Sequence, residues 1–188
     1  MMIIEKSCSF DAGESFTLRN IKAEEVSIDY IEWLNSAEVN KYLSISIPIT
    51  LEEQISYISD KRESETDAYV GLFNSENKLI GTSGIQNLSG SYTCSFGIVI
   101  GSPNYRGIGL GKYLIYFISK MIFEQSDNNK IYIEVERENV PSLSSFLWCG
   151  YKFVDDIVIH VTFDPRHKIK ESCRYMICEE TDLKLQSL

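Results

Sequence analysis

The sequence has few of the residues that usually build metal, redox or disulfide-stabilised sites. Its 188 residues include two histidines, His160 and His167, and no C-x-x-C pair. No His/Cys cluster with zinc spacing is present, so we expect no bound metal. Scattered cysteines favour reduced, buried thiols over a disulfide framework. The five cysteines are Cys8, Cys94, Cys149, Cys173 and Cys178.

Long apolar runs and an excess of basic residues are also missing. No stretch approaches the roughly 18 apolar residues of a membrane span, and the first residues lack the apolar segment and cleavage site of a signal peptide. There are 18 Lys and Arg against 27 Asp and Glu, a net charge of −9. This balance does not suit nucleic acid or an anionic membrane, which are bound through Lys and Arg. We therefore expect a cytoplasmic protein with no nucleic-acid or membrane partner, and a cationic small substrate fits its charge better.

The hydrophobic pattern predicts one domain over residues 1–188, of class α+β, with a mixed, mostly antiparallel central sheet flanked by helices. Thr50 and Glu53 form a predicted capping box, and Asn139 is a predicted N-cap of a short helix that ends at Gly150. The other predicted helices cover about 24–36, 50–62 and 112–124. The predicted strands cover about 15–19, 69–73, 78–82, 93–100, 130–135, 155–162 and 173–178.

A glycine-rich turn lies between a predicted strand and an amphipathic helix. Its glycines allow the backbone to turn tightly and to approach a ligand closely. The free N–H groups of the first helical turn then point at an anion, helped by the helix dipole. Arg106 and Lys112 add positive charge at both edges. The turn predicts an anion site made of Arg106, Gly107, Ile108, Gly109, Leu110, Gly111 and Lys112.

Two common phosphate-binding motifs do not fit this turn. A Walker A loop requires glycine at Arg106 and Ser or Thr at Tyr113. The dinucleotide fingerprint, started at Gly107, requires glycine at Lys112. A plain nucleotide-binding α/β protein is therefore disfavoured.

The turn does resemble the R-x-x-G-x-G motif of the GNAT superfamily of acetyl-CoA-dependent N-acetyltransferases. Arg106, Gly109 and Gly111 are the matching positions. A second segment, 138–153, resembles another GNAT hallmark: an Asn after a strand, a small residue three positions later, a short helix, and Gly-Tyr entering a strand. The matches there are Asn139, Ser142 and Gly150-Tyr151.

Segments 16–19, 30–43, 79–85 and 96–100 also resemble the ribosomal-protein-type branch of this superfamily. The resemblance covers about residues 15–180 and is strongest over 95–153. It implies a single GNAT-like domain that uses acetyl-CoA as cosubstrate. The loop amides would hold the pyrophosphate of the coenzyme, and the helix with Asn139, Ser142 and Phe146 would line the pantetheine arm.

The resemblance implies transfer of the acetyl group to a primary amine by direct attack in a ternary complex. The oxyanion would be stabilised by a backbone N–H near Ile98, Val99 and Ile100, where the strand splays from its neighbour. The acceptor is left open among a protein N-terminus, a polyamine and an amino sugar. Trp33 and Tyr42 are candidates to line its pocket, although hydrophobic core is the expected role of both.

The sequence departs from the GNAT pattern at two catalytic positions. Phe146 stands where many relatives have a tyrosine acid, and Ser95 where many ribosomal-type relatives have a glutamate. On strand 130–136, Glu134 and Glu136 share one face with Tyr132, so both carboxylates are candidate bases beside Ser95.

Four further side chains carry groups that could take part in the chemistry. Tyr132 and Tyr151 are candidate acids for which packing is the favoured role. Cys94 and Cys149 are disfavoured as nucleophiles, because no histidine is placed beside either in the sequence.

A second function class stays open on the same residues. The departures at Phe146 and Ser95 allow a non-catalytic acyl-CoA-binding module with a GNAT fold. The sequence leaves the choice between monomer and homodimer open.

Overall fold

The computed structural model describes residues 8–11, 13–43, 48–88, 94–154 and 170–185. The chain divides into two compact units, one of residues 1–84 and 98–110 and the other of residues 85–97 and 111–188. Strands β4 (Leu79–Gln86) and β5 (Cys94–Ile100) contribute residues to both units. Parallel and antiparallel pairings occur together with helices, which confirms the predicted α+β class. The single domain over residues 1–188 stays a prediction.

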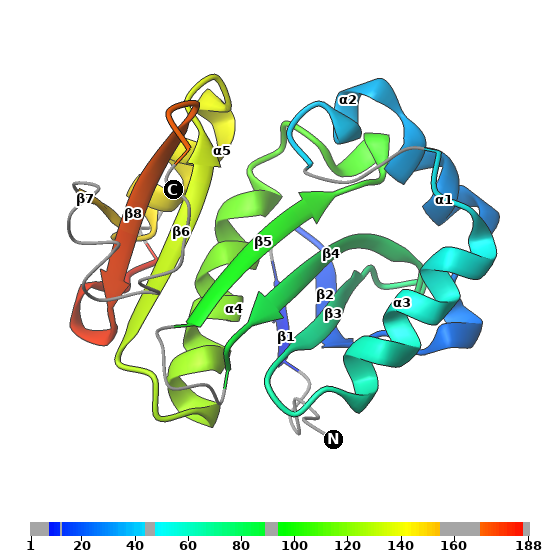
Figure 1. Cartoon of the computed structure of the whole chain (residues 1–188), viewed down its shortest axis with the longest axis horizontal. Helices are drawn as coiled ribbons and strands as arrows, with labels where there is room; N and C mark the ends of the chain where they lie inside the picture. The colour runs from blue at the N-terminus through cyan, green and yellow to red at the C-terminus, as the bar shows by residue number, and fades with distance from the viewer. Residues whose placement is uncertain (1–7, 12, 44–47, 89–93, 155–169, 186–188) are drawn as a thin grey trace. The chain divides into compact units, whose positions relative to one another are not determined.

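The first unit is built around antiparallel strands with helices on one face. Strand β2 pairs with β1 and β3, with Thr17 opposite Phe73, and β4 follows β3. Helices α1 and α3 lie over one face of these strands (Figure 1). The elements are β1 (Cys8–Asp11), β2 (Ser15–Asn20), β3 (Ala68–Phe73), α1 (Ile28–Asn35), α2 (Ala37–Asn40) and α3 (Leu51–Glu63), with 3-10 turns at Ala23–Glu25 and Pro103–Tyr105.

Side-chain caps decide where these helices begin. The capping box of Thr50 and Glu53 is confirmed and starts α3 at Leu51. The helix expected from residue 24 instead begins at Ile28, because the Ser27 hydroxyl accepts the Tyr30 N–H at 3.2 Å. Ser and Thr at such positions satisfy an N–H that has no partner within the helix.

The core of the first unit joins α1 and α3 to the sheet. Tyr30 is 1% exposed, and its hydroxyl hydrogen-bonds to Gln54 Nε2 at 2.7 Å and to the Tyr69 hydroxyl at 2.9 Å. A buried phenol thus has two partners, which offsets the cost of removing it from water. The buried members of this cluster are Ile21, Val26, Tyr30, Ile31, Trp33, Leu34, Ile58 and Phe73.

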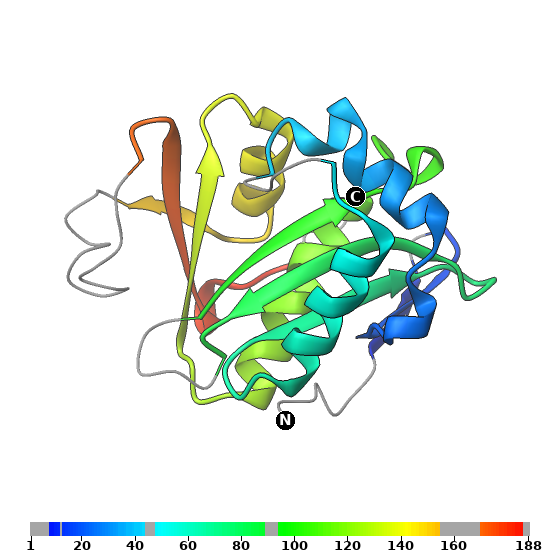
Figure 2. The ribbon, with the colours of Figure 1, turned by 45° about the vertical axis from the view of Figure 1, so that its right-hand side comes forward.

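The second unit is built on strand β6 (Lys130–Glu136). Strand β8 (Cys173–Glu179) pairs antiparallel with β6 along its full length, and the short β7 (Lys152–Val154) pairs with β8 (Figure 2). The first residues of β5 pair parallel with β6, Cys94 opposite Ile131 and Ser95 opposite Tyr132. The strand expected at 155–162 lies outside the described residues.

Two helices of the second unit follow the sequence pattern. Helix α4 (Leu110–Gln125) buries the predicted apolar positions Leu114, Ile115, Ile118 and Ile122 at 1% exposure or less. Helix α5 (Val140–Trp148) is capped by Asn139, as predicted. A 3-10 turn at Glu180–Asp182 follows β8.

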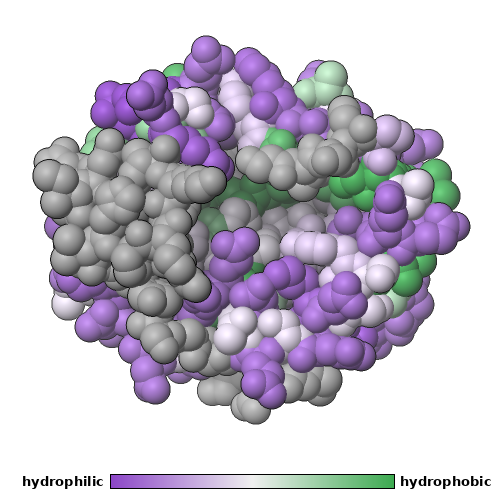
Figure 3. Space-filling view, viewed as in Figure 1, coloured by the Kyte–Doolittle hydropathy of each residue, from purple (hydrophilic) through white to green (hydrophobic). Residues whose placement is uncertain are grey.

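On the face in Figure 3, hydrophilic residues cover most of the described surface and apolar residues show in small patches. No helix among the described residues is long and apolar enough to span a bilayer.

Gly150 follows the end of α5 at a position that leaves no space for a side chain. Its φ is +99°, and an added Cβ would lie 2.0 Å from the Asp182 carbonyl oxygen. We expect Gly150→Ala to lower the free energy of unfolding by about 2 kcal/mol or more, from backbone strain and this clash. Urea denaturation measures it.

Gly13 provides the matched control. Its φ is also positive, at +91°, but no heavy atom lies within 4 Å of an added Cβ. Gly13→Ala should cost about 1 kcal/mol, the conformational part alone. Equal losses in the two variants would show that the clash at Gly150 does not contribute.

Candidate functional site

The glycine-rich turn presents an open stretch of backbone. Gly107 and Gly109 have φ of +75° and +85°, and no heavy atom lies within 4 Å of an added Cβ at either. Ile108 between them is 61% exposed, whereas Leu110 is 2% exposed and starts α4. These glycines therefore serve backbone conformation, and the space beside them suits a ligand that approaches the N–H groups.

Arg106 is turned toward the protein. Its Nε donates to the Ile100 carbonyl at 3.2 Å, and its two terminal nitrogens bond to the Gly101 carbonyl and to the Glu38 carboxylate. The guanidinium thus holds the carboxyl end of β5, where the predicted oxyanion segment, Ile98 to Ile100, is half-buried. The free positive edge expected at Arg106 is therefore already shared with three protein acceptors.

Lys112 and α5 meet at the first turn of α4. The Lys112 ammonium lies 4.8 Å from the centroid of the Trp148 ring, a cation–π distance. The Cys149 thiol donates to the Lys112 carbonyl at 3.3 Å. The end of α5 thereby supports the helix terminus that follows the glycine-rich turn.

The start of α5 has the predicted capping geometry. The Asn139 side-chain oxygen accepts the Ser142 N–H at 3.3 Å, and proline occupies the first turn. Phe146 is 2% exposed and packs between Phe96 and Tyr151, with centroids 5.8 and 5.0 Å away. Its predicted apolar role fits this packing, while contact of Asn139, Ser142 and Phe146 with a pantetheine arm stays a prediction.

The three candidate catalytic residues share one face of the β5–β6 pair. Ser95 lies opposite Tyr132, which is two and four positions from Glu134 and Glu136 on the same face of β6. The described ladder between the two strands consists of the pairs at Cys94 and Ser95. Parallel pairing of β5 with β6 thus ends before the segment expected to stabilise the oxyanion.

Each candidate carboxylate already has a partner in the second unit. Glu134 accepts from the Lys170 ammonium at 2.6 Å, and Glu136 accepts from the Ser172 hydroxyl at 3.3 Å. The hydrogen bond to Glu134 raises the pKa of Lys170 above its ordinary value. Glu134 is therefore the carboxylate of an ion pair with Lys170.

The packing roles favoured for Tyr132 and Tyr151 are confirmed. Tyr151 is 2% exposed and hydrogen-bonds to the Ser119 hydroxyl at 2.7 Å, and burial raises its pKa well above 10. Tyr132 belongs to a buried cluster with Cys173 and Tyr175.

A large cavity that the sequence did not predict lies in the first unit. Its volume is about 990 Å³, at the upper end of the usual range for small-molecule sites. Trp33 is 7% exposed, which confirms the core role expected of it, and it also lines this cavity, whereas Tyr42 is not among the lining residues. Apolar side chains contribute to the wall, and the rest is mostly polar. The apolar members are Trp33, Phe73, Leu79, Ile80 and Pro103.

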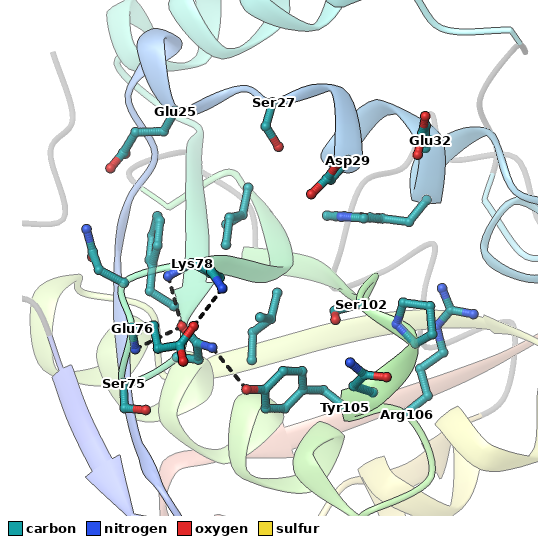
Figure 4. A pocket seen from close by; sticks show the side chains of 18 of the residues that line it. Glu25, Ser27, Asp29, Glu32, Ser75, Glu76, Lys78, Ser102, Tyr105 and Arg106 are labelled. Atoms are coloured by element: carbon teal, nitrogen blue, oxygen red, sulfur yellow. Dashed lines mark hydrogen bonds and ion pairs between the residues drawn. The ribbon is translucent and has the colours of Figure 1, made fainter.

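Acidic side chains outnumber basic ones in the polar wall (Figure 4). Against them stand two cations, Lys78 and Arg106, each already in an ion pair. Asp29 and Glu32 lie one helical turn apart on α1, exposed, and form no ion pair with another described residue. The carboxylates come from five separate segments, so no local motif reveals them. They are Glu14, Glu25, Asp29, Glu32, Glu38 and Glu76.

The charged pairs of the wall shift the pKa values of their members. Burial alone would raise the pKa of Glu25, but bonds from Arg19 and from the Lys22 N–H lower it below its ordinary value. The hydrogen bond to Glu76 raises the pKa of Lys78, and Asp29 adds to that shift. Both shifts favour the charged forms of Glu25 and Lys78, and acidic residues outnumber basic ones in the wall.

The buried thiols of Cys149 and Cys178 in the second unit should react slowly with alkylating reagents. Burial raises the pKa of Cys149 and of Cys178 to about 12. At about pH 8 roughly one such thiol in 10⁴ is the reactive thiolate, so we expect iodoacetamide to label both thiols very slowly in the folded protein. Mass spectrometry should find the labelling rate rising about tenfold per pH unit. Urea-unfolded protein is the control, and rapid labelling of folded protein at neutral pH would contradict the burial argument.

Comparison with known proteins supports one family. The family model described as an acetyltransferase (GNAT) domain matches residues 15–152. No curated protein matches the sequence. Among solved structures, Mycobacterium smegmatis RimJ in complex with CoA-disulfide matches with a TM-score of 0.77 at 12% identity, over 95% of this chain and 89% of that chain.

Two other solved structures have the same fold. Spermidine N-acetyltransferase from Vibrio cholerae, in complex with CoA and spermine, has a TM-score of 0.72 at 18% identity and covers 89% of this chain and 96% of that chain. The aminoglycoside acetyltransferase AAC(6′)-Ib in complex with coenzyme A has a TM-score of 0.69 at 16% identity, and the match covers 89% of this chain and 96% of that chain.

Proposed function

Because this chain belongs to the acetyltransferase (GNAT) family, we propose that it transfers the acetyl group of acetyl-CoA to a primary amine of a small polycation. The observation that carries the choice of acceptor is the acidic cavity beside the carboxyl end of β5. Among the acceptors that the sequence leaves open, a polyamine or a similar oligoamine fits this wall best.

The glycine-rich turn is the proposed coenzyme site. The open backbone of Gly107 and Gly109 and the start of α4 at Leu110 offer N–H groups to a pyrophosphate. Asn139, Ser142 and Phe146 on α5 are proposed to support the pantetheine arm. The solved structures of RimJ and of AAC(6′)-Ib contain the coenzyme, or its disulfide, on the same fold, which supports this assignment.

The cavity is the proposed acceptor site. Its carboxylates are spread along α1, α2 and the β3–β4 turn, an arrangement that matches several amines along one flexible chain better than a single charge. The apolar wall at Trp33 and Leu79 suits the methylene segments between the amines. The Vibrio cholerae structure holds spermine, a ligand of this class.

The reaction would proceed by direct attack in a ternary complex. An alkylammonium with a pKa near 10 must first lose a proton, and Glu134, Glu136 and Ser95 remain the candidates to pass it on through water. The amine nitrogen then bonds to the thioester carbon and the C–S bond breaks. The CoA thiolate can leave as the anion, because its pKa is only about 8.5.

The unpaired acids of α1 provide the first test. We expect the double variant Asp29→Asn, Glu32→Gln to raise KM for spermidine about fivefold, because two exposed carboxylates each contribute a few tenths to 1 kcal/mol. The kcat should change little. The double variant Asp60→Asn, Glu63→Gln, which removes two exposed carboxylates outside the cavity, is the matched control in the same assay. Identical kinetics for the double variant and wild type would exclude the cavity as the acceptor site.

Gly109 provides the second test. Gly109→Ala places a Cβ in open space but strains a residue with φ of +85°. The turn should shift, and calorimetry should find CoA binding weakened about tenfold. Gly13→Ala introduces the same strain in an open turn outside the glycine-rich turn and should leave CoA binding unchanged. A Gly109→Ala protein that binds CoA like wild type would contradict the assignment.

A non-catalytic acyl-CoA-binding module is the second candidate. The buried Phe146 and the ion pair of Glu134 with Lys170 favour it, because neither position offers a ready proton donor or acceptor. Tight CoA binding with no acetyl transfer to a panel of amines would select this candidate.

A further inference from the structure

Arg106 joins the acidic cavity to the glycine-rich turn. It lines the cavity and is the first residue of the turn. Its guanidinium bonds to the Ile100 and Gly101 carbonyls at the end of β5 and to the Glu38 carboxylate. A change at Glu38 therefore reaches the turn through one side chain.

A second contact, from Trp33 on α1, also reaches the end of β5. An added Cβ at Gly101 would lie 2.0 Å from the Trp33 ring, so the indole rests directly on this backbone. Trp33 lines the cavity as well. The Gly101 backbone is thus held between the indole of α1 and the guanidinium of Arg106.

Glu38 differs from the other paired acids of the wall. Glu25 is paired with Arg19, and Glu76 with Lys78, neither of which belongs to the turn. Among the described lining residues, Glu38 is the acid that pairs with Arg106. Its side chain is 82% exposed, whereas that of Arg106 is 25% exposed, so an entering cation reaches the carboxylate more easily than the guanidinium.

We propose that the Glu38–Arg106 ion pair couples amine binding in the acidic cavity to coenzyme binding at the glycine-rich turn. This inference rests on the proposed function. A polyamine that binds Glu38 removes the carboxylate partner of Arg106. The guanidinium charge is then less compensated, and the adjacent turn attracts the pyrophosphate of the coenzyme more strongly. Linkage requires the reverse as well: the coenzyme strengthens amine binding by the same factor.

The expected coupling is modest. Exposed ion pairs contribute about 0.2–1 kcal/mol, so we expect CoA affinity to change about threefold. Glu38 is in this account a positioning residue, since it acts on the coenzyme only through Arg106.

Isothermal titration of CoA, with and without saturating spermidine, tests the proposal. Wild type should bind CoA about threefold more tightly when spermidine is present. Glu38→Gln should bind CoA about threefold more tightly than wild type without spermidine, and spermidine should add little. Glu63→Gln also removes one negative charge, but at a residue outside the cavity, and its CoA affinity should depend on spermidine as in wild type. Because Glu38 is exposed, the substitution should leave thermal unfolding unchanged.

Two outcomes would overturn the proposal. One is a CoA affinity in wild type that does not depend on spermidine. The other is a Glu38→Gln protein that keeps the wild-type coupling, which would indicate direct attraction between the two ligands. Acetyl transfer is measured separately: coupling without transfer refutes the proposed function alone, and transfer without coupling refutes this inference alone. A protein that does not bind CoA refutes both.

Discussion

The carboxyl end of strand β5 depends on one guanidinium. Strand ends leave carbonyl groups that need donors when they are taken from water, and Arg106 supplies those donors to Ile100 and Gly101. The Gly101 and Ser102 N–H groups donate to the Ile80 carbonyl, so backbone and side-chain bonds together hold this end of the strand. The same side chain closes one side of the acidic cavity. Arg106 therefore positions both proposed binding sites, and its charge is shared between backbone and Glu38 rather than held for a ligand.

The cavity of the first unit carries more negative than positive side chains. Six carboxylates around one cavity repel one another, and pairs with Arg19, Lys78 and Arg106 offset that repulsion only in part. Of the other three, Glu14 accepts hydrogen bonds from Tyr105 and Ser75, and Asp29 and Glu32 form no ion pair with another described residue. A cationic amine would offset this negative charge, which is the physical basis of the proposed polyamine acceptor.

Short-range signals in the sequence predicted much of the fold. The capping box at Thr50, the cap at Asn139 and the glycine at 150 each act over a few residues, and all three appear in the structure. The apolar face of α4 was equally local. Errors arose where one hydroxyl decided a boundary: Ser27 starts α1 later than the hydrophobic pattern indicates.

The cavity could not be predicted, because its walls come from segments far apart in the chain. Glu14 and Tyr105 are 91 residues apart yet hydrogen-bonded, and Glu38 meets Arg106 across 68 residues. The features of the sequence that point to an acidic cavity are the net charge of −9 and the three-residue spacing of Asp29 and Glu32. The ion pair of Glu134 with Lys170 could not be predicted from the sequence either, because the two residues are 36 positions apart and come together through the β6–β8 pairing.

Two-substrate kinetics with acetyl-CoA and spermidine test the central claim most directly. The account predicts amine-dependent release of CoA, acetylspermidine as the product by mass spectrometry, and reciprocal plots that intersect, as a ternary complex requires. No acetylated product with any oligoamine, or parallel plots that indicate an acetyl-enzyme intermediate, would contradict it.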